Sequence, residues 1–313
     1  MTEWQYHVFG AQVNSDRQIP GLKESLFPTT SRLMTVELRS RPRSWFRQFL
    51  KNQSIKTANS WFQYEPTVAG IYVCWRGLFE FVVADQGRTV FYGFLNYGLN
   101  ESFSHYFLSQ ILSVNFLQMG IETLHGASAY IDQQGVFIIG DSGFGKSTLV
   151  KYLLEQGGLL ISDDLLLMIP GGLGFHCYAG PSRIKIAHHK KAPRHNFRVL
   201  EKMNPLTNKA IVEVPGVEAK GHPLMLKRIY VLSHPDHPSN QRFSIERVNG
   251  SGRLKSLLAN VFNPFDESRE RLSSQLIQFS CLAEEVPIKS LTYPRRLSSL
   301  PQVMDMIHSD LVH

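Results

Sequence analysis

Residues 140–148 read Gly140-Asp141-Ser142-Gly143-Phe144-Gly145-Lys146-Ser147-Thr148. The run satisfies the pattern G-x-x-x-x-G-K-[ST] in full, with an apolar segment directly before it and a helix expected directly after it. Glycines let the backbone turn so that successive N–H groups face a phosphate, and the first turn of the helix adds a positive end. Lys146 can then reach the β- and γ-phosphates of a nucleotide, and the Ser147 hydroxyl can ligate Mg²⁺. The segment therefore predicts a phosphate-binding loop; the alternative is a glycine-rich turn that binds nothing.

A pair of carboxylates follows the helix of this loop. Asp163 and Asp164 come directly after Ser162, at the end of a short strand expected at residues 159–161. Because the carboxyl ends of parallel neighbouring strands meet at one edge of a sheet, we expect both aspartates beside the loop. Phosphoryl transfer needs a carboxylate to hold Mg²⁺ and, in a kinase, one to accept the proton of the attacking hydroxyl. The pair can divide these tasks, whereas the alternative is two solvated loop carboxylates.

The sequence around the loop predicts an α/β core. Strand, loop, helix and strand follow one another from residue 125 to residue 161, as in a nucleotide-binding core. The predicted strands are residues 127–131, 136–139, 159–161 and 228–232, and the predicted helices are residues 146–156, 252–261 and 302–311. The fold of the basic, turn-rich stretch at residues 182–223 cannot be predicted.

The first third of the chain is rich in β-strand patterns. Short runs of β-branched and aromatic residues predict hairpins or a meander over residues 6–9, 70–75, 78–83 and 89–92. A helix with an aromatic stripe is expected at residues 101–118, capped by Asn100 and ended by Gly120, and the stripe is expected to pack in a core. We therefore predict a smaller β-rich N-terminal domain, residues 1–98, and an α/β catalytic domain, residues 99–313.

Composition narrows the class of protein. The 313 residues are 43% hydrophobic and 19% charged, which is a globular balance that needs no disulfide or metal to hold a core. Cys74, Cys177 and Cys281 are widely separated, so neither a disulfide framework nor a zinc site is predicted. The N-terminus does not resemble a secretory signal, and the most apolar long stretch, residues 103–119, is too polar for a membrane span. We therefore expect a soluble, cytoplasmic protein with no membrane partner.

The chain is basic, with a net charge of +7 and a pI near 9.3, which favours anionic partners. Part of this charge lies between residues 183 and 198, at Arg183, Lys185, Lys190, Lys191, Arg194 and Arg198. The run is either a solvated surface loop or a positive rim that holds phosphates or steers an acidic peptide. Arg183, just after Gly180-Pro181-Ser182, is the candidate to approach a γ-phosphate. Only Phe197 supplies an aromatic ring within the run, so we expect no nucleic-acid partner.

Three segments carry a family resemblance: Leu124-His125-Gly126-Ala127-Ser128, Gly135–Ser147 and Gly157–Asp164. Over residues 124–164 the chain resembles the catalytic domain of HPr kinase/phosphorylase, which phosphorylates a serine of a small carrier protein. More loosely, Tyr6–Gly10, the aromatic helix and Leu226–Leu232 look like HPr-kinase-like proteins found beside peptide-modification genes. Some of these, in lasso-peptide pathways, phosphorylate the C-terminal serine of a precursor peptide.

The resemblance implies a P-loop, HPr-kinase-like α/β catalytic domain that uses ATP and Mg²⁺. It implies that Lys146 and Ser147 bind the phosphates and Mg²⁺, that Asp163 is the general base, and that Asp164 lies near the metal. His125 would lie at the active site and orient an aspartate or a phosphate, although a lone histidine at a strand start is ordinarily structural. Thr148 replaces a glutamate of the bifunctional enzymes, and their C-terminal arginine- and glycine-rich region is not found. The resemblance therefore does not imply the second activity of these enzymes, in which phosphate reverses the phosphorylation. It also does not imply HPr as the substrate.

Three hypotheses for the function stay open. The first is an ATP-dependent kinase of a serine hydroxyl on a peptide or small protein, with the C-terminal serine of a lasso-type precursor as the acceptor. The second is a kinase of a small-molecule hydroxyl such as free serine, and the third is a non-catalytic nucleotide-binding regulatory protein. Paired aspartates favour catalysis, and a β-rich N-terminal region favours a peptide, because peptides often add as strands to sheet edges. HPr-type enzymes form hexamers, so a homo-oligomer is consistent with the resemblance.

Overall fold

The structure is a computed structural model that describes residues 3–25, 34–50, 61–96, 100–172, 174–187, 197–204, 209–217, 222–234, 242–263 and 265–312. The chain divides into two compact units, Met1–Ile121 and Glu122–His313. The aromatic helix, expected to open the catalytic domain at residue 99, belongs to the first unit instead. Within the described ranges no helix combines the length and the apolar character that a membrane span requires.

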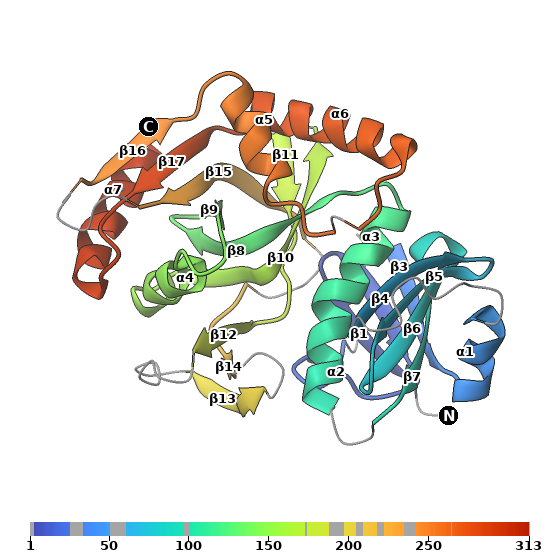
Figure 1. Cartoon of the computed structure of the whole chain (residues 1–313). Coiled ribbons are helices and arrows are strands. Elements are labelled where there is room, and N and C mark those ends of the chain that lie inside the picture. The colour runs from blue at the N-terminus through green and yellow to red at the C-terminus, as the bar shows by residue number, and fades with distance from the viewer. Residues whose placement is uncertain are drawn as a thin grey trace. The chain divides into compact units, whose positions relative to one another are not determined.

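The first unit contains a seven-stranded sheet with the order β1-β2-β3-β7-β6-β5-β4 (Figure 1). Its strands are β1 Trp4–Val8, β2 Ala11–Ser15, β3 Met34–Ser40, β4 Phe62–Thr67, β5 Gly70–Trp75, β6 Phe79–Ala84 and β7 Thr89–Phe94. Strands β4 to β7 form an antiparallel meander, as predicted, and β3 runs parallel to both β2 and β7. The expected strands at residues 6–9, 70–75, 78–83 and 89–92 are confirmed to within two residues at each end.

Helices complete this first unit. They are α1 Arg43–Leu50, α2 Asn100–Tyr106 and α3 Leu112–Gln118, with a π-helical turn at Phe107–Ile111 between the last two. The predicted aromatic stripe packs in the core, because the Phe103 ring stacks 5.4 Å from Phe81 and 6.3 Å from Phe107. Gly120 follows the helix with a φ of 76°, a conformation that glycine adopts without strain.

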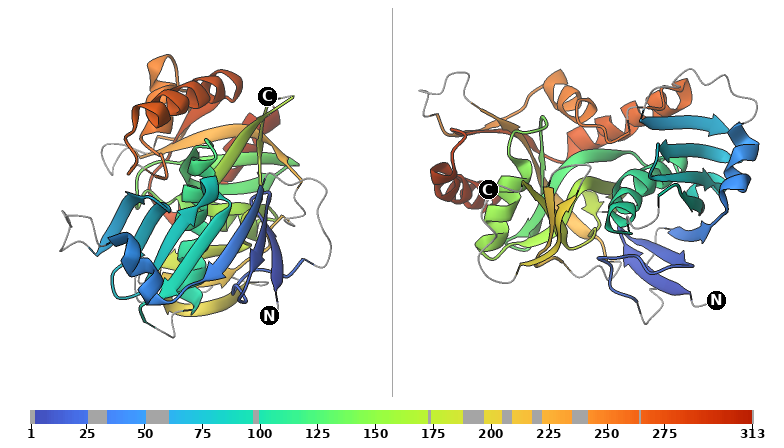
Figure 2. Two further views of the ribbon diagram at one scale, coloured as in Figure 1. Left: turned by 90° about the vertical axis from the view of Figure 1, so that its right-hand side faces the viewer. Right: turned by 60° about the horizontal axis from the view of Figure 1, so that its bottom comes forward.

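The second unit contains a seven-stranded mixed sheet with the order β11-β10-β8-β9-β15-β17-β16. Its strands are β8 Thr123–Ile131, β9 Gln134–Ile139, β10 Leu159–Gly171, β11 Gly174–Cys177, β15 Leu224–Ser233, β16 Ser244–Arg247 and β17 Ile288–Thr292. Strands β9, β15 and β17 run parallel, as in a nucleotide-binding core. A small separate sheet joins β12 Arg183–Ala187, β14 Lys209–Glu213 and β13 Arg198–Asn204, and Figure 2 shows it beside the main sheet. This small sheet is the fold of the described part of the basic stretch.

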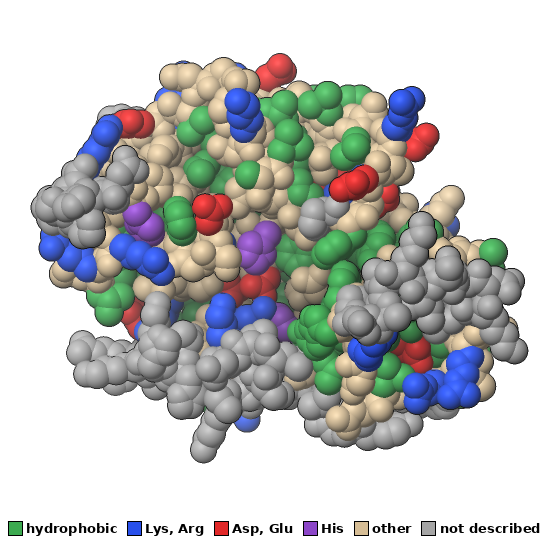
Figure 3. Space-filling view, in the orientation of Figure 1, with side chains coloured by type: hydrophobic (Ala, Val, Ile, Leu, Met, Phe, Trp, Pro, Cys, Tyr) green, Lys and Arg blue, Asp and Glu red, His purple; other side chains and the backbone are tan. Residues whose placement is uncertain are grey.

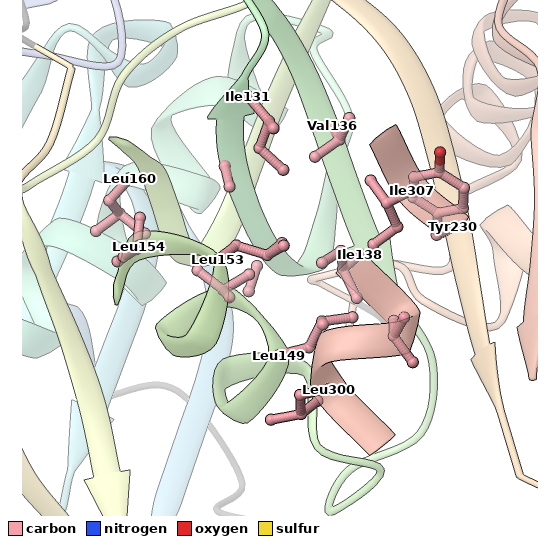
Figure 4. Packing of buried hydrophobic residues seen from close by; sticks show 14 of the residues in the cluster. Ile131, Val136, Ile138, Leu149, Leu153, Leu154, Leu160, Tyr230, Leu300 and Ile307 are labelled. Atoms are coloured by element: carbon pink, nitrogen blue, oxygen red, sulfur yellow. The ribbon is translucent and has the colours of Figure 1, made fainter. Parts of the chain in front are cut away.

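Helices cover both faces of the main sheet. They are α4 Lys146–Glu155, α5 Ser251–Leu258, α6 Arg269–Glu285 and α7 Leu300–Val312. On one face Leu149 and Leu153 of α4 and Ile307 of α7 pack against Val136 and Ile138 (Figure 4). On the other face α5 and α6 contribute Leu257, Phe279 and Leu282, which pack with Phe137 and Ile139. Successive residues of β9 thus enter opposite cores, which confirms an α/β layered architecture for this unit.

The placement of β10 corrects one expectation. The strand after the loop's helix was expected to lie beside β9 and to end at the aspartates, but β8 lies between β9 and β10 and is antiparallel to both. The reason is the turn at Asp132 and Gln133, whose φ values of 49° and 62° suit a two-residue hairpin that pairs β8 with β9. Strand β10 then adds on the outer side of β8 and continues through Asp163 and Asp164 to Gly171.

Candidate active site

The predicted phosphate loop connects β9 to α4. Gly140, Gly143 and Gly145 have φ values of 136°, 83° and 98°, and Gly145 directly precedes the first turn of α4. The backbone of Gly140 also lies close to Leu232 of β15. A Cβ atom added to Gly140 would lie 3.1 Å from the carbonyl oxygen of Leu232. Only glycine combines these conformations and this approach without strain. The loop thus has the backbone that the pattern requires, and it ends at a helix N-terminus, where an anion is stabilised.

The Lys146 side chain lies folded against the loop. Its Nζ donates hydrogen bonds to the carbonyl oxygens of Gly140, at 2.7 Å, and Asp141, at 3.1 Å, and the residue is 7% exposed. Burial lowers the pKa of Lys146, while the charges of Asp163 and Asp164 oppose this shift. Both of these contacts are to neutral carbonyl oxygens, so Lys146 is a candidate to pair with an incoming phosphate.

Asp163 lies beside the serine of the loop. The Ser147 hydroxyl donates a hydrogen bond of 3.1 Å to Asp163 Oδ1, and the backbone N–H of Lys185 donates one of 3.0 Å to Oδ2. Burial and the neighbouring charge of Asp164 raise the pKa of Asp163 to about 6, against the effect of these hydrogen bonds. The structure therefore brings the loop and the first aspartate together.

Asp164 has a different environment. Its φ of 72° is unusual within a strand, and its Oδ2 lies 2.6 Å from the ammonium nitrogen of Lys185. Lys185 thus contacts both aspartates, Asp163 through its backbone and Asp164 through its side chain. In the sequence this lysine was one of several charges in the basic stretch, and nothing distinguished it from the others.

His125 is the third residue of β8, because this strand begins at Thr123, four residues earlier than the expected strand at residues 127–131. It pairs with Leu165, so it is a neighbour of Asp164 across the β8–β10 ladder. Burial lowers the pKa of His125, and the charge of Asp164 opposes this shift, while nearby lysines reinforce it. The structure therefore places the histidine close to Asp164 in the sheet.

Asn260, after α5, joins two parts of the site. Its side-chain Oδ1 accepts the N–H of Gly140 at 2.9 Å, and its carbonyl oxygen accepts the N–H of His125 at 2.7 Å. The residue is 8% exposed, so few water molecules can replace these contacts. Sequence reasoning missed Asn260, because no local pattern marks an asparagine that bonds a loop 120 positions away.

Of the remaining residues that the sequence singled out, the structure describes some and leaves others outside its described ranges. Arg183 opens β12 and is buried; Ile184 and Ile186 enter the core, so Arg183 shares the opposite face of the strand with Lys185. Thr148 lies half-buried in the first turn of α4. Lys190, Lys191 and Arg194 lie outside the described residues. Figure 3 shows basic, acidic and histidine side chains together near the middle of one face.

The donor set suits a magnesium ion that arrives with a nucleotide. Among the residues that the structure describes, no cluster of three or more His, Cys, Asp or Glu is arranged to hold a metal. Mg²⁺ in nucleotide sites is commonly held by one or two carboxylates together with substrate phosphates and water. Ser147 and Asp163 offer the hard oxygen atoms that such a partial site needs.

Comparisons with known proteins give short or distant similarities. No protein-family model matches the chain. The HPr kinase/phosphorylase of Mycoplasmopsis pulmonis is 36% identical over 63 residues, which are 20% of this chain and 20% of that protein. The match thus spans about a fifth of the length of that curated relative. The solved structure of the HPr(Ser) kinase/phosphatase from Coxiella burnetii aligns with 60% of this chain and 88% of its own, at 16% identity and a TM-score of 0.32.

Proposed function

We propose that this protein is an ATP-dependent kinase that transfers the γ-phosphoryl group to a serine hydroxyl of a peptide or small protein. The observation that carries the proposal is the hydrogen bond from Ser147 to Asp163, which joins a phosphate loop to a pair of carboxylates. The match to an HPr kinase/phosphorylase supports the same reaction class, since that protein's name denotes a kinase.

Residues 140–148 bind the phosphates in this proposal. When bound, ATP supplies the γ-phosphoryl group, and Mg²⁺ neutralises charge on its oxygens. Lys146 leaves the carbonyls of Gly140 and Asp141 to pair with the β- and γ-phosphates. The glycines and the first turn of α4 orient backbone N–H groups toward the same phosphates. Arg183, on the same face of β12 as Lys185, adds positive charge near the γ-phosphate.

The two aspartates divide the remaining tasks, and we assign them in the reverse of the order that the resemblance implies. Asp163 contacts the serine expected to ligate Mg²⁺, and a backbone N–H fixes its other oxygen, so we assign it to the metal with Ser147. Asp164 is held by the long side chain of Lys185, which can move when a substrate enters. Asp164 then accepts the proton of the substrate's serine hydroxyl. The oxygen of that hydroxyl forms a bond to the γ-phosphorus, and the bond between this phosphorus and the ADP oxygen breaks. His125 orients Asp164.

The acceptor in this proposal is a peptide, and the C-terminal serine of a lasso-type precursor is the specific candidate. The net charge of +7 favours an anionic partner. The edge strands β1 and β4 of the first unit belong to the kind of sheet to which extended peptides add. We place the reaction in the cytoplasm, since the chain's three cysteines are free thiols. A kinase of free serine is the second candidate, and a homo-oligomer stays a prediction.

Mass spectrometry of candidate acceptors tests the proposal. Serine-ended precursor peptides, HPr and free serine are each incubated with the protein, ATP and Mg²⁺. A gain of one phosphate on a peptide serine supports the peptide kinase and identifies the position. Phosphorylation of free serine alone favours the second candidate, and ATP binding without transfer to any acceptor favours a non-catalytic protein.

A further inference from the structure

Two side chains from the carboxyl ends of parallel strands reach the tip of the phosphate loop. His234 directly follows β15, and its Nε2 lies 2.9 Å from the carbonyl oxygen of Phe144. Arg295 lies three residues beyond β17, and its guanidinium donates a hydrogen bond to the carbonyl oxygen of Gly143. In open α/β sheets this edge is where ligands bind, so both side chains come from the functional end of the sheet.

The histidine also connects the loop to the core. Its Nδ1 lies 3.1 Å from the carbonyl oxygen of Tyr293, and its ring lies 5.1 Å from the ring of Phe144 and 5.6 Å from that of Tyr293. Tyr293 is 3% exposed and belongs to the core cluster of α4 and α7. The loop tip is therefore attached through His234 to a fixed part of the fold.

Both ring nitrogens of His234 face acceptors. A carbonyl oxygen cannot donate, so each of these hydrogen bonds needs an N–H on the imidazole. A neutral imidazole supplies one and an imidazolium supplies two. His234 and Arg295 thus bind two successive carbonyl groups at the loop tip, those of Phe144 and Gly143.

These contacts set the direction of the loop's own donors. A trans peptide is planar, so its C=O and N–H groups point in opposite directions. When His234 holds the carbonyl of Phe144, the N–H of Gly145 in the same peptide points away from His234. Gly145 is the last loop residue before α4, and its N–H is one of the donors that a phosphate loop turns toward its ligand.

We propose that His234, assisted by Arg295, is a positioning residue that fixes the phosphate-loop tip for nucleotide binding. The inference rests on the proposed nucleotide-binding function. It concerns binding rather than transfer, because neither side chain contacts Ser147, Asp163 or Asp164 in the contacts described above. Loss of the His234 contact raises the KM for ATP and leaves kcat unchanged.

A series of variants at His234 tests the proposal. His234→Phe keeps an aromatic ring between Phe144 and Tyr293 but removes both hydrogen bonds, whereas His234→Gln keeps an N–H group at the position of Nε2. We expect ATP·Mg²⁺ to bind His234→Phe about tenfold more weakly than wild type by calorimetry, and His234→Gln to regain most of the affinity. Arg295→Ala should weaken binding less, since Arg295 is exposed, and Arg247→Ala in the exposed end of β16 serves as its control.

The outcomes separate this inference from the proposed function. Thermal unfolding without nucleotide shows whether each variant folds, and KM and kcat are measured on the same samples. An unchanged ATP affinity in a folded His234→Phe would overturn the positioning role while leaving the kinase intact. A folded wild type that binds no nucleotide would overturn the proposed function itself.

Discussion

The hydroxyl of Ser147 donates a hydrogen bond of 3.1 Å to Oδ1 of Asp163. Ser147 is the second residue of α4, the helix after the phosphate loop, and Asp163 lies within β10, which is separated from the loop's own strand by β8. The contact therefore joins the loop's helix to a strand that is not a neighbour of the loop's own strand. In the proposed mechanism this contact assigns Asp163 to the metal together with Ser147 and assigns Asp164 to the proton.

This division predicts different losses in two variants. Asp163→Asn should weaken the Mg²⁺-dependent part of ATP affinity by at least about tenfold, because a metal-side carboxylate is lost. Asp164→Asn should keep that affinity while transfer falls by about a hundredfold or more, the usual contribution of a general base. Calorimetry with Mg²⁺ and with a chelator, together with transfer rates, checks both. Retained affinity with lost transfer in Asp163→Asn would restore the order that the resemblance implies.

Asn260 should matter for stability as well as for binding. Asn260→Ala leaves the buried N–H of Gly140 without its acceptor, which costs about 1–3 kcal/mol of unfolding free energy. The loop would also lose its link to His125, so ATP affinity should fall. Urea denaturation and calorimetry measure the two effects, with the exposed Asn249→Ala as the control. Equal stability of the two variants would show that the Gly140 contact contributes nothing.

The environment of Asp310 predicts how the free energy of unfolding changes at acidic pH. This carboxylate of α7 is partly buried, which raises its pKa, but bonds from Lys289 and Tyr230 and the charge of Arg228 lower it overall. A carboxyl group whose pKa is lowered by folding stabilises the protein at pH values above its ordinary pKa of 3.8. This stabilisation is lost as the pH falls through the pKa of the group in the folded protein.

Asp310→Asn should therefore destabilise the protein by about 2 kcal/mol at pH 7, since its bonds to charged groups weaken. The difference from wild type should shrink as the pH approaches 3. Denaturation curves at a series of pH values measure it. A difference that is the same at pH 7 and near pH 3 would contradict a role for the ionised carboxylate.

Local signals made the loop predictable. The pattern at residues 140–148, the apolar strand before it and the helix after it are all encoded within one short segment, and the structure confirms the strand and the helix. The same holds for the antiparallel meander of the first unit, whose strands alternate with turn residues. The signals could not give the order of strands, because the hairpin at Asp132 and Gln133 decides which partner β10 meets.

The contacts that complete the site depend on distant parts of the chain. Lys185 contacts the aspartates only because β12 pairs with β14 and lies against α4. Nothing in the local sequence distinguishes this lysine from the other charges of the basic stretch. His234 and Arg295 reach the loop across about 90 and 150 positions. Their roles follow from β15 and β17 ending at the same edge as β9. In a single sequence such residues cannot be told from solvated surface charges.

Transfer from γ-labelled ATP to an acceptor serine by wild type, Lys146→Ala and Lys151→Ala tests the kinase most directly. Lys151 lies on the same helix as Lys146 but pairs with Glu155, so its variant controls for loss of a lysine from α4. We predict transfer by wild type, transfer within about twofold of it for Lys151→Ala, and a loss of at least about a hundredfold for Lys146→Ala. A folded Lys146→Ala that transfers phosphate at the wild-type rate would contradict the account.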